Sequence, residues 1–232
     1  MVNKKRILIE NIPTLIWGPT SDKVYIYVHG KMGCKENAEH FAEIAISKGY
    51  QVISFDLPEH GERKNQEYSI MAWNAVKDLK HVSNYVINKW KEINLYACSL
   101  GAYFSLLAYK DIDMKKCLFQ CPVLNMEILI SKMMTWSDIT EDQLMREKVI
   151  PTSMGETLYW DYLIYSKENP VDEWKVKTHI LYPSKDRLTD RLTVDNFANA
   201  HSVYLTVLDG AEHYFKEEKY LKQLEIWLQS TI

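Results

Sequence analysis

The stretch Leu95-Tyr96-Ala97-Cys98-Ser99-Leu100-Gly101-Ala102-Tyr103 joins a predicted strand to a predicted helix, with a serine at the corner between them. Small residues flank this serine, Ala97 two positions before it and Gly101 two positions after it. A tight corner strains the serine backbone, and only small neighbours let the strand and the helix approach closely. The helix N-terminus lies at the corner, so the Leu100 N–H can face a developing negative charge. The stretch predicts a nucleophilic serine or, in the simpler interpretation, a serine that only caps the helix.

The sequence on both sides of this corner alternates between short apolar runs and longer segments with helical periodicity. Short runs of β-branched and aromatic residues predict strands, and apolar residues recurring every three or four positions predict helices. Strands and helices in alternation form βαβ units, which build an α/β fold with a mostly parallel sheet and helices on both faces. The predicted strands are residues 23–28, 51–55, 93–97, 116–120, 177–182 and 202–207, and the predicted helices are residues 35–48, 70–90, 100–109 and 215–229.

Residues 125–170 interrupt this alternation, because no clear strand is present there. The segment holds five of the nine methionines together with several Trp and Tyr residues. We expect a helical insertion at residues 125–170, between two parts of a core formed by residues 1–124 and 171–232. In a parallel sheet this insertion would lie over the carboxyl ends of the strands. Three of its adaptable or aromatic side chains are expected to contact a bound substrate, namely Met133, Trp136 and Trp160.

Polar and glycine-containing loops follow several of the predicted strands. The first of these loops, His29-Gly30-Lys31-Met32-Gly33, is suited to presenting backbone N–H groups. Asp186 lies just beyond a later predicted strand, and His213 lies in the loop before the last helix. Ligands of parallel sheets bind outside the carboxyl ends of the strands, so Ser99, Asp186 and His213 are predicted to meet there.

The serine corner, the His-Gly loop, the chain order Ser, Asp, His and the segment Asp56-Leu57-Pro58-Glu59-His60-Gly61 together resemble the α/β-hydrolase family. Within that family the chain is similar to small bacterial esterases, lipases and acyl-peptidase-like members with a helical cap. The resemblance runs from about residue 23 to the end of the sequence, and residues 125–170 match the cap. The sequence departs from the family at Ala97, where glycine is usual and alanine is tolerated.

The resemblance implies a role for each matching residue. Ser99 matches the nucleophile, Asp186 the acid and His213 the base of a catalytic triad. The backbone N–H groups of Lys31 and Leu100 match the donors of an oxyanion hole. The implied chemistry is acyl transfer, in which the base takes the serine proton, the serine attacks a carbonyl and water later releases the acyl-enzyme. No metal and no organic cofactor is expected.

The triad acid has two alternatives in the sequence. Asp190 follows Asp186 by four residues, and Asp209 precedes His213 by four residues. Asp186 is favoured because it directly follows the end of a strand. Cys98 is a further candidate nucleophile beside the serine, but its side chain is expected to point away from the tip of the corner.

The remaining histidines and cysteines have structural interpretations. His29 and His60 are expected to be structural residues of their loops rather than to take part in chemistry. Of the four cysteines only Cys117 and Cys121 are close in sequence, and no histidine lies near them. Zinc sites usually use paired Cys or His ligands at tight spacing, so reduced thiols and no metal site are expected.

Composition and charge limit the classes of function. The 232 residues are 47% hydrophobic and 25% charged, as is usual for a globular domain. The formal net charge of −3 provides no field that would attract nucleic acid or anionic lipid. The N-terminal apolar run is too short for a signal peptide, and no run approaches the roughly 20 apolar residues of a membrane span. We expect a cytoplasmic protein with a small-molecule acyl substrate and no nucleic-acid or membrane partner.

The predicted function is hydrolysis of a small or medium carboxylic ester by a serine hydrolase. Thioesterase and acyl-peptide hydrolase are alternatives, because the same triad serves all three reactions and a fold does not determine a substrate. The sequence does not indicate an oligomeric state. A non-catalytic small-molecule binder is a further alternative, although such proteins typically lack a triad residue and all three are present here.

Overall fold

The predicted strands lie side by side in one mixed sheet. The computed structural model describes residues 3–201 and 203–232, and within them the sheet has eight strands in the order β1-β2-β4-β3-β5-β6-β9-β10. β2 pairs antiparallel with β1 and with β4, and the neighbouring pairs from β4 to β10 are parallel. The strands are β1 (Lys4–Ile9), β2 (Ile12–Trp17), β3 (Lys23–Val28), β4 (Gln51–Phe55), β5 (Glu92–Cys98), β6 (Lys116–Gln120), β9 (Thr178–Pro183) and β10 (Tyr204–Leu208).

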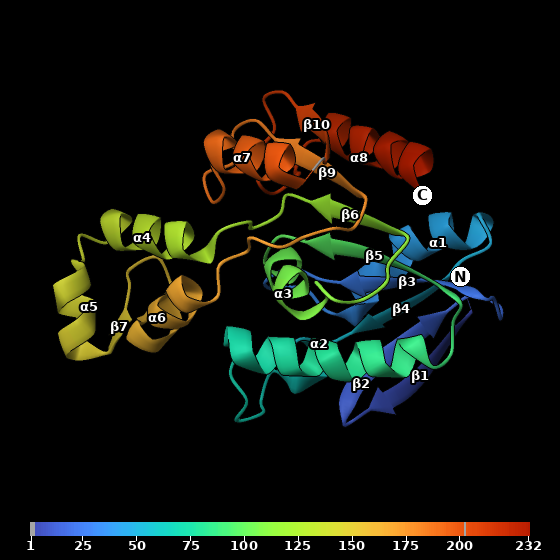
Figure 1. The fold of residues 1–232 in the computed structure, drawn as a ribbon, viewed down its shortest axis with the longest axis horizontal. Coiled ribbons are helices and arrows are strands. Elements are labelled where there is room, and N and C mark those ends of the chain that lie inside the picture. Colours follow the sequence, from blue (N-terminus) through green and yellow to red (C-terminus); the bar gives the residue numbers. More distant parts are fainter. Residues whose placement is uncertain (1–2, 202) are drawn as a thin grey trace.

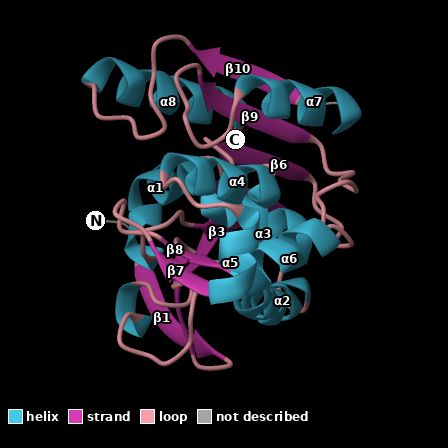
Figure 2. Ribbon diagram, turned by 90° about the vertical axis from the view of Figure 1, so that its left-hand side faces the viewer, coloured by secondary structure: helices cyan, strands magenta, loops and turns pink. Residues whose placement is uncertain are grey.

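The central strands are apolar on both sides of the sheet. In β3, Val24 and Ile26 are buried in one core, and Tyr25 and Tyr27 are buried in the other. Parallel strands covered on both faces need such continuous apolar sequence. Figure 2 shows the two layers of helices, with α1 and α8 on one side of the sheet and α2, α3 and α7 on the other. These elements are α1 (Glu39–Ser47), α2 (Ala72–Ile87), α3 (Leu100–Ala108), α7 (Arg191–His201) and α8 (Glu218–Thr231), with the short 3₁₀ helices η1 (Lys35–Ala38) and η2 (Gly61–Arg63).

The structure confirms the mostly parallel sheet with helices on both faces. The strands at 23–28, 51–55 and 116–120 agree with the prediction to the residue, and the other predicted strands shift by one or two residues. Ser202, the first residue expected in the last strand, lies outside the described residues.

The apolar pattern did not predict the hairpin formed by β1 and β2. Its turn consists of Glu10 and Asn11, whose φ angles are 46° and 67°. Two successive residues with positive φ make the tight turn whose twist suits a hairpin. Asparagine is common at such a position and glutamate is not, so the sequence carries only part of the usual turn signal.

The insertion lies beyond the carboxyl ends of the strands, on the side toward which the arrows of β5 and β6 point (Figure 1). It contains three helices, and the expectation that it contains no strand is wrong, because β7 and β8 form a short antiparallel pair. Strands of three residues are too short to show an alternating pattern. No helix in the described ranges is both long and apolar enough to cross a membrane. The elements are α4 (Met126–Trp136), α5 (Glu141–Glu147), β7 (Val149–Pro151), β8 (Thr157–Tyr159) and α6 (Trp160–Glu168).

Candidate active site

Ser99 lies at the corner between β5 and α3 in a strained backbone conformation. Its φ is 50° and its ψ is −117°, and the residue is buried. Close contacts leave no room for a side chain at Gly101, one of the two small neighbours of the serine, and little room at Gly30. A Cβ added at Gly101 would lie 2.4 Å from the carbonyl oxygen of His29, and a Cβ added at Gly30 would lie 3.2 Å from the Cβ of Ser99. The corner and the His-Gly loop therefore pack directly against each other.

The structure brings Ser99, His213 and Asp186 into one chain of hydrogen bonds. The Oγ of Ser99 lies 2.8 Å from Nε2 of His213, and Nδ1 of His213 lies 2.7 Å from Oδ2 of Asp186. An ionised carboxylate only accepts hydrogen bonds, so Nδ1 donates to it and Nε2 is left to accept the serine proton. The other Asp186 oxygen accepts the N–H of Leu188 at 2.8 Å and that of Thr189 at 3.3 Å. Both oxygens of the carboxylate are thus held in place.

The two alternative acids have other partners. Oδ1 of Asp190 accepts the N–H of Thr193 at 2.8 Å near the start of α7, and Oδ2 pairs with Lys132 at 2.8 Å. The hydrogen bond from Lys132 lowers the pKa of Asp190 to about 2. Asp209 accepts the hydroxyl of Ser184 at 3.1 Å. Of the three candidate carboxylates, Asp186 is the one in contact with the histidine.

Cys98 has the properties of a structural thiol. Burial raises its pKa to about 12, so the side chain is a neutral thiol near neutral pH. The thiolate is the nucleophilic form of cysteine, and this environment disfavours it. Over the described residues no three His, Cys, Asp or Glu side chains are grouped so as to hold a metal ion.

Lys31 and Leu100 line the same cavity as Ser99. Within the described part of the chain, neither backbone N–H donates to a protein acceptor. Leu100 is the first residue of α3, where an N–H has no partner inside the helix. Both residues thus line the cavity with a backbone N–H that has no protein acceptor among the described residues. The Lys31 side chain forms an ion pair with Glu156, in the turn between β7 and β8.

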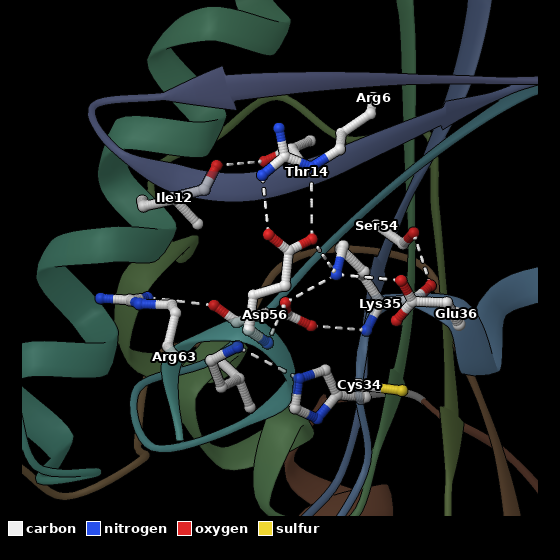
Figure 3. Close-up of polar contacts among 12 residues, drawn as sticks. Arg6, Ile12, Thr14, Cys34, Lys35, Glu36, Ser54, Asp56 and Arg63 are labelled. Atoms are coloured by element: carbon white, nitrogen blue, oxygen red, sulfur yellow. Dashed lines mark hydrogen bonds and ion pairs between the residues drawn. The ribbon is translucent and has the colours of Figure 1, made fainter. Parts of the chain in front are cut away.

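A buried ion pair joins the loop after β3 to the loop after β4. Lys35 and Asp56 are 2% and 0% exposed, and Nζ of Lys35 lies 2.8 Å from Oδ2 of Asp56 (Figure 3). The backbone N–H of Lys35 donates to the other Asp56 oxygen at 2.9 Å. Gly61 has no room for a side chain here, because a Cβ would lie 2.2 Å from the same carboxylate. Removing one partner of a buried pair costs about 3–5 kcal/mol, so the two loops are firmly connected.

A cavity of about 850 Å³ opens over Ser99 and His213. One side is apolar and comes mainly from α4 and the residues before it. The segment after β4, which includes Asp56–Gly61, supplies much of another side, a contribution that no sequence pattern indicates. The lining includes Val123, Met126, Leu129, Ile130, Met133 and Trp136 on the apolar side and Glu59, His60, Lys64, Ser69, Ile70 and Met71 from the segment after β4.

Met133 and Trp136 are part of this lining, and their contact with a substrate stays a prediction, whereas Trp160 is not part of it. The Trp160 ring packs against the hydrophobic core, with Nζ of Lys148 5.3 Å from the ring centre. Tyr162 lies two residues further along α6, roughly on the opposite side of the helix, and lines the cavity instead. The expectation that Trp160 contacts a substrate is therefore wrong for this geometry.

The sequence matches no protein-family model and no curated protein. Solved structures are similar to the chain over most of its length. Est1E from Butyrivibrio proteoclasticus, solved with ferulic acid bound, superimposes with a TM-score of 0.78 at 15% identity, over 97% of this chain and 96% of Est1E. The Pyrococcus furiosus esterase Pf2001 superimposes with a TM-score of 0.72 at 17% identity, over 100% of this chain and 90% of Pf2001. The Paleococcus ferrophilus monoacylglycerol lipase superimposes with a TM-score of 0.67 at 14% identity, over 95% of this chain and 99% of the lipase. The similarity thus concerns the whole architecture rather than one motif.

Proposed function

The chain has the α/β-hydrolase fold, and we propose that it is a serine hydrolase that cleaves small or medium carboxylic esters. The observation that carries the proposal is the continuous contact from Ser99 Oγ through His213 to the buried carboxylate of Asp186. A serine hydroxyl is a weak nucleophile unless a base takes its proton, and the base needs a third group to orient it. All three parts are in contact here.

The mechanism follows from this geometry. Nε2 of His213 takes the proton of Ser99 as Oγ attacks the ester carbonyl carbon, and Asp186 stabilises the imidazolium that forms. The N–H groups of Lys31 and Leu100 stabilise the oxyanion. His213 then gives its proton to the leaving alcohol, and a water molecule activated by the same histidine releases the acid from the acyl-enzyme.

The cavity supports an acyl substrate of limited length. We assign residues 125–170 as a cap over the site, since α4 and the β8–α6 segment provide much of the lining above Ser99. Each buried CH₂ of an acyl chain contributes about 0.8 kcal/mol in such surroundings. Similar structures that are named esterases or lipases favour an ester over the thioesters and acyl-peptides that the same triad could cleave.

The experiment that tests the proposal is labelling with a fluorophosphonate, followed by peptide mapping. The probe phosphonylates an activated serine, so we expect Ser99 to be labelled and Ser99→Ala to lose both labelling and esterase activity while its Tm stays nearly unchanged. Cys98→Ser is the matched control next to the corner and is expected to keep both. Labelling of another residue, or full esterase activity in Ser99→Ala, would overturn the proposal.

A further inference from the structure

Two buried histidines face each other between the loops that follow β3 and β4. His29 directly follows β3 and is 1% exposed, and His60 lies in the loop after β4 and is 8% exposed. Their ring centres are 5.2 Å apart. Neither ring takes part in the mechanism above, so the chemistry of the triad does not account for their burial.

Each ring bonds to its own loop through Nδ1 and to the other loop through Nε2. Nδ1 of His29 lies 2.7 Å from the carbonyl oxygen of Gly30, and Nδ1 of His60 lies 2.7 Å from that of Pro58. A carbonyl oxygen can only accept, so both Nδ1 atoms carry the proton. The resulting neutral tautomer leaves each Nε2 as an acceptor.

Each of the two Nε2 atoms accepts a hydrogen bond from a backbone N–H of the other loop. The N–H of Leu57, in the loop after β4, donates to Nε2 of His29 at 3.1 Å. The N–H of Met32, in the loop after β3, donates to Nε2 of His60 at 2.9 Å. We call this pair of crossed hydrogen bonds the histidine clasp.

The clasp holds the loop at the residue after Lys31. Met32 has a φ of 64°, a conformation that costs a residue with a Cβ about 1–2 kcal/mol and therefore needs support from its surroundings. The Met32 side chain is exposed and offers little packing, which leaves the bond from its N–H to His60 as a direct tether of this backbone. Lys31 directly precedes this tethered residue in the loop.

We propose that His60 is a positioning residue for oxyanion stabilisation, because by accepting the Met32 N–H it keeps the Lys31 N–H directed at the substrate carbonyl. His29 completes the clasp by holding the loop that carries His60. The inference rests on the proposed function of Ser99 and extends it to a residue whose ring is hydrogen-bonded to Pro58 and Met32. An oxyanion donor contributes about 10²–10³-fold to kcat, so loss of its alignment is measurable.

Two substitutions at His60 separate the acceptor from the rest of the side chain. In His60→Asn, the amide nitrogen can replace Nδ1 as donor to Pro58, but no acceptor reaches the Met32 N–H. In His60→Gln, the longer side chain can place its carbonyl oxygen near the position of Nε2. Exposed His40 on α1 provides the matched control, His40→Asn.

The readouts are kcat and KM on p-nitrophenyl butyrate, Tm, and Ki for an alkyl trifluoromethyl ketone. Ser99 Oγ adds to the ketone carbon, its proton passes to His213, and the carbonyl oxygen becomes an oxyanion in the same hole. For His60→Asn we expect kcat to fall and Ki to rise, both by about 10²-fold, with little change in KM. His60→Gln is expected to have kcat and Ki close to the wild-type values, and His40→Asn is expected to change neither kcat nor Ki.

The outcomes distinguish this inference from the proposed function. If the wild-type protein is labelled at Ser99 but His60→Asn keeps its kcat and Ki, or if His60→Gln is as impaired as His60→Asn, the positioning role of His60 is wrong and the triad stands. If the wild-type protein is not labelled, the proposed function itself fails. Should His60→Asn not fold, nitrogen-15 NMR of the wild-type imidazoles decides, because an Nε2–H tautomer at His60 would rule out the clasp.

Discussion

Ser99 holds a backbone conformation that its neighbours must stabilise. Its φ and ψ of 50° and −117° lie outside the regions that residues with a Cβ favour. The N–H of Ser99 donates to the carbonyl oxygen of Gln120 at 3.0 Å, and its own carbonyl oxygen accepts the N–H of Val123 at 3.1 Å. The end of β6 therefore supports the strained residue from the side opposite the His-Gly loop. Strain of this kind at a buried serine is typical of a reactive side chain held at the tip of a turn.

Gly101 sets how closely α3 approaches the end of β3. A Cβ at this position would lie 2.4 Å from the carbonyl oxygen of His29 and 2.8 Å from that of Val28, and backbone atoms cannot turn away as a side chain can. Gly101→Ala must therefore displace the segment that leads to Lys31. We expect kcat/KM on p-nitrophenyl butyrate to fall about 10²-fold, the effect of a displacement of about 1 Å in a catalytic group.

Gly49→Ala is a suitable control for this prediction. Gly49 has a φ of 85°, so alanine there is strained by about 1 kcal/mol, but its Cβ would meet no atom within 4 Å. Both variants are expected to lower Tm, and only Gly101→Ala to lower the kcat/KM of the folded protein. Equal kcat/KM values for the two variants would mean that the approach of α3 to β3 does not position the site.

At the residue scale, the sequence predicts a contact between side chains when the topology of the sheet alone brings them together. Ser99, Asp186 and His213, the proposed triad, come after strands of the parallel part of one sheet, so their loops share an edge. The contact between His60 and the Met32 N–H depends instead on how two loops cross, and no periodicity encodes that. Trp160 was wrongly expected in the cavity because the aromatic composition of a segment does not reveal which side of its helix faces inward.

At the scale of elements, α4 is the helix that gives the cavity its apolar side. Met126, Leu129, Ile130 and Met133 recur at intervals of three and four residues, which places them on one face of the helix, and all four line the cavity. Trp136 extends this face at the last residue of α4 and is 43% exposed. The helix thus offers an apolar surface that ends in a partly solvated aromatic ring.

Trp136→Ala is therefore expected to lower kcat/KM on longer esters more than on short ones. We expect kcat/KM on p-nitrophenyl esters of the wild-type protein to rise from acetate to hexanoate, by up to about fourfold for each buried CH₂. Removal of the Trp136 ring should reduce this rise and leave acetate nearly unchanged. Trp160→Ala removes the same ring outside the cavity and should keep the wild-type profile. If the two variants have the same profile, or if the wild-type profile is flat, α4 does not select the acyl chain.

At the scale of the whole molecule, the sequence predicts the central strands of the sheet better than it predicts the elements around them. The central strands are buried on both faces and appear as continuous apolar runs. Helix α7, which was not predicted, has Val194 and Phe197 as its buried residues, so its apolar stripe is too narrow to stand out from a loop. The cavity is a product of tertiary packing between α4, the β7–β8 pair and the loops of the core, and no single segment contains that information.

Two groups with unusual pKa values couple the folding of the whole molecule to pH. Burial lowers the pKa of His29 from its ordinary value of 6.5 to about 4. Hydrogen bonds from Arg6 and then Lys35 lower the pKa of Glu62 from 4.5 to about 2. Between the ordinary and the shifted value of each group, the unfolded chain binds more protons than the folded one. Stability therefore rises with pH in both windows, and it is lost as pH falls through them.

Acid is expected to destabilise the protein first between pH 6.5 and 4 through His29, and then between pH 4.5 and 2 through Glu62. The His29 contribution is on the order of 3 kcal/mol, present in full above pH 6.5 and lost by pH 4. The free energy of unfolding, measured by urea titration at several pH values between 7 and 4, should fall less steeply in His29→Asn, because asparagine does not titrate. His40→Asn, at an exposed histidine, should keep the wild-type slope. The same slope in His29→Asn and in the wild-type protein would mean that burial does not lower the pKa of His29 in the folded state.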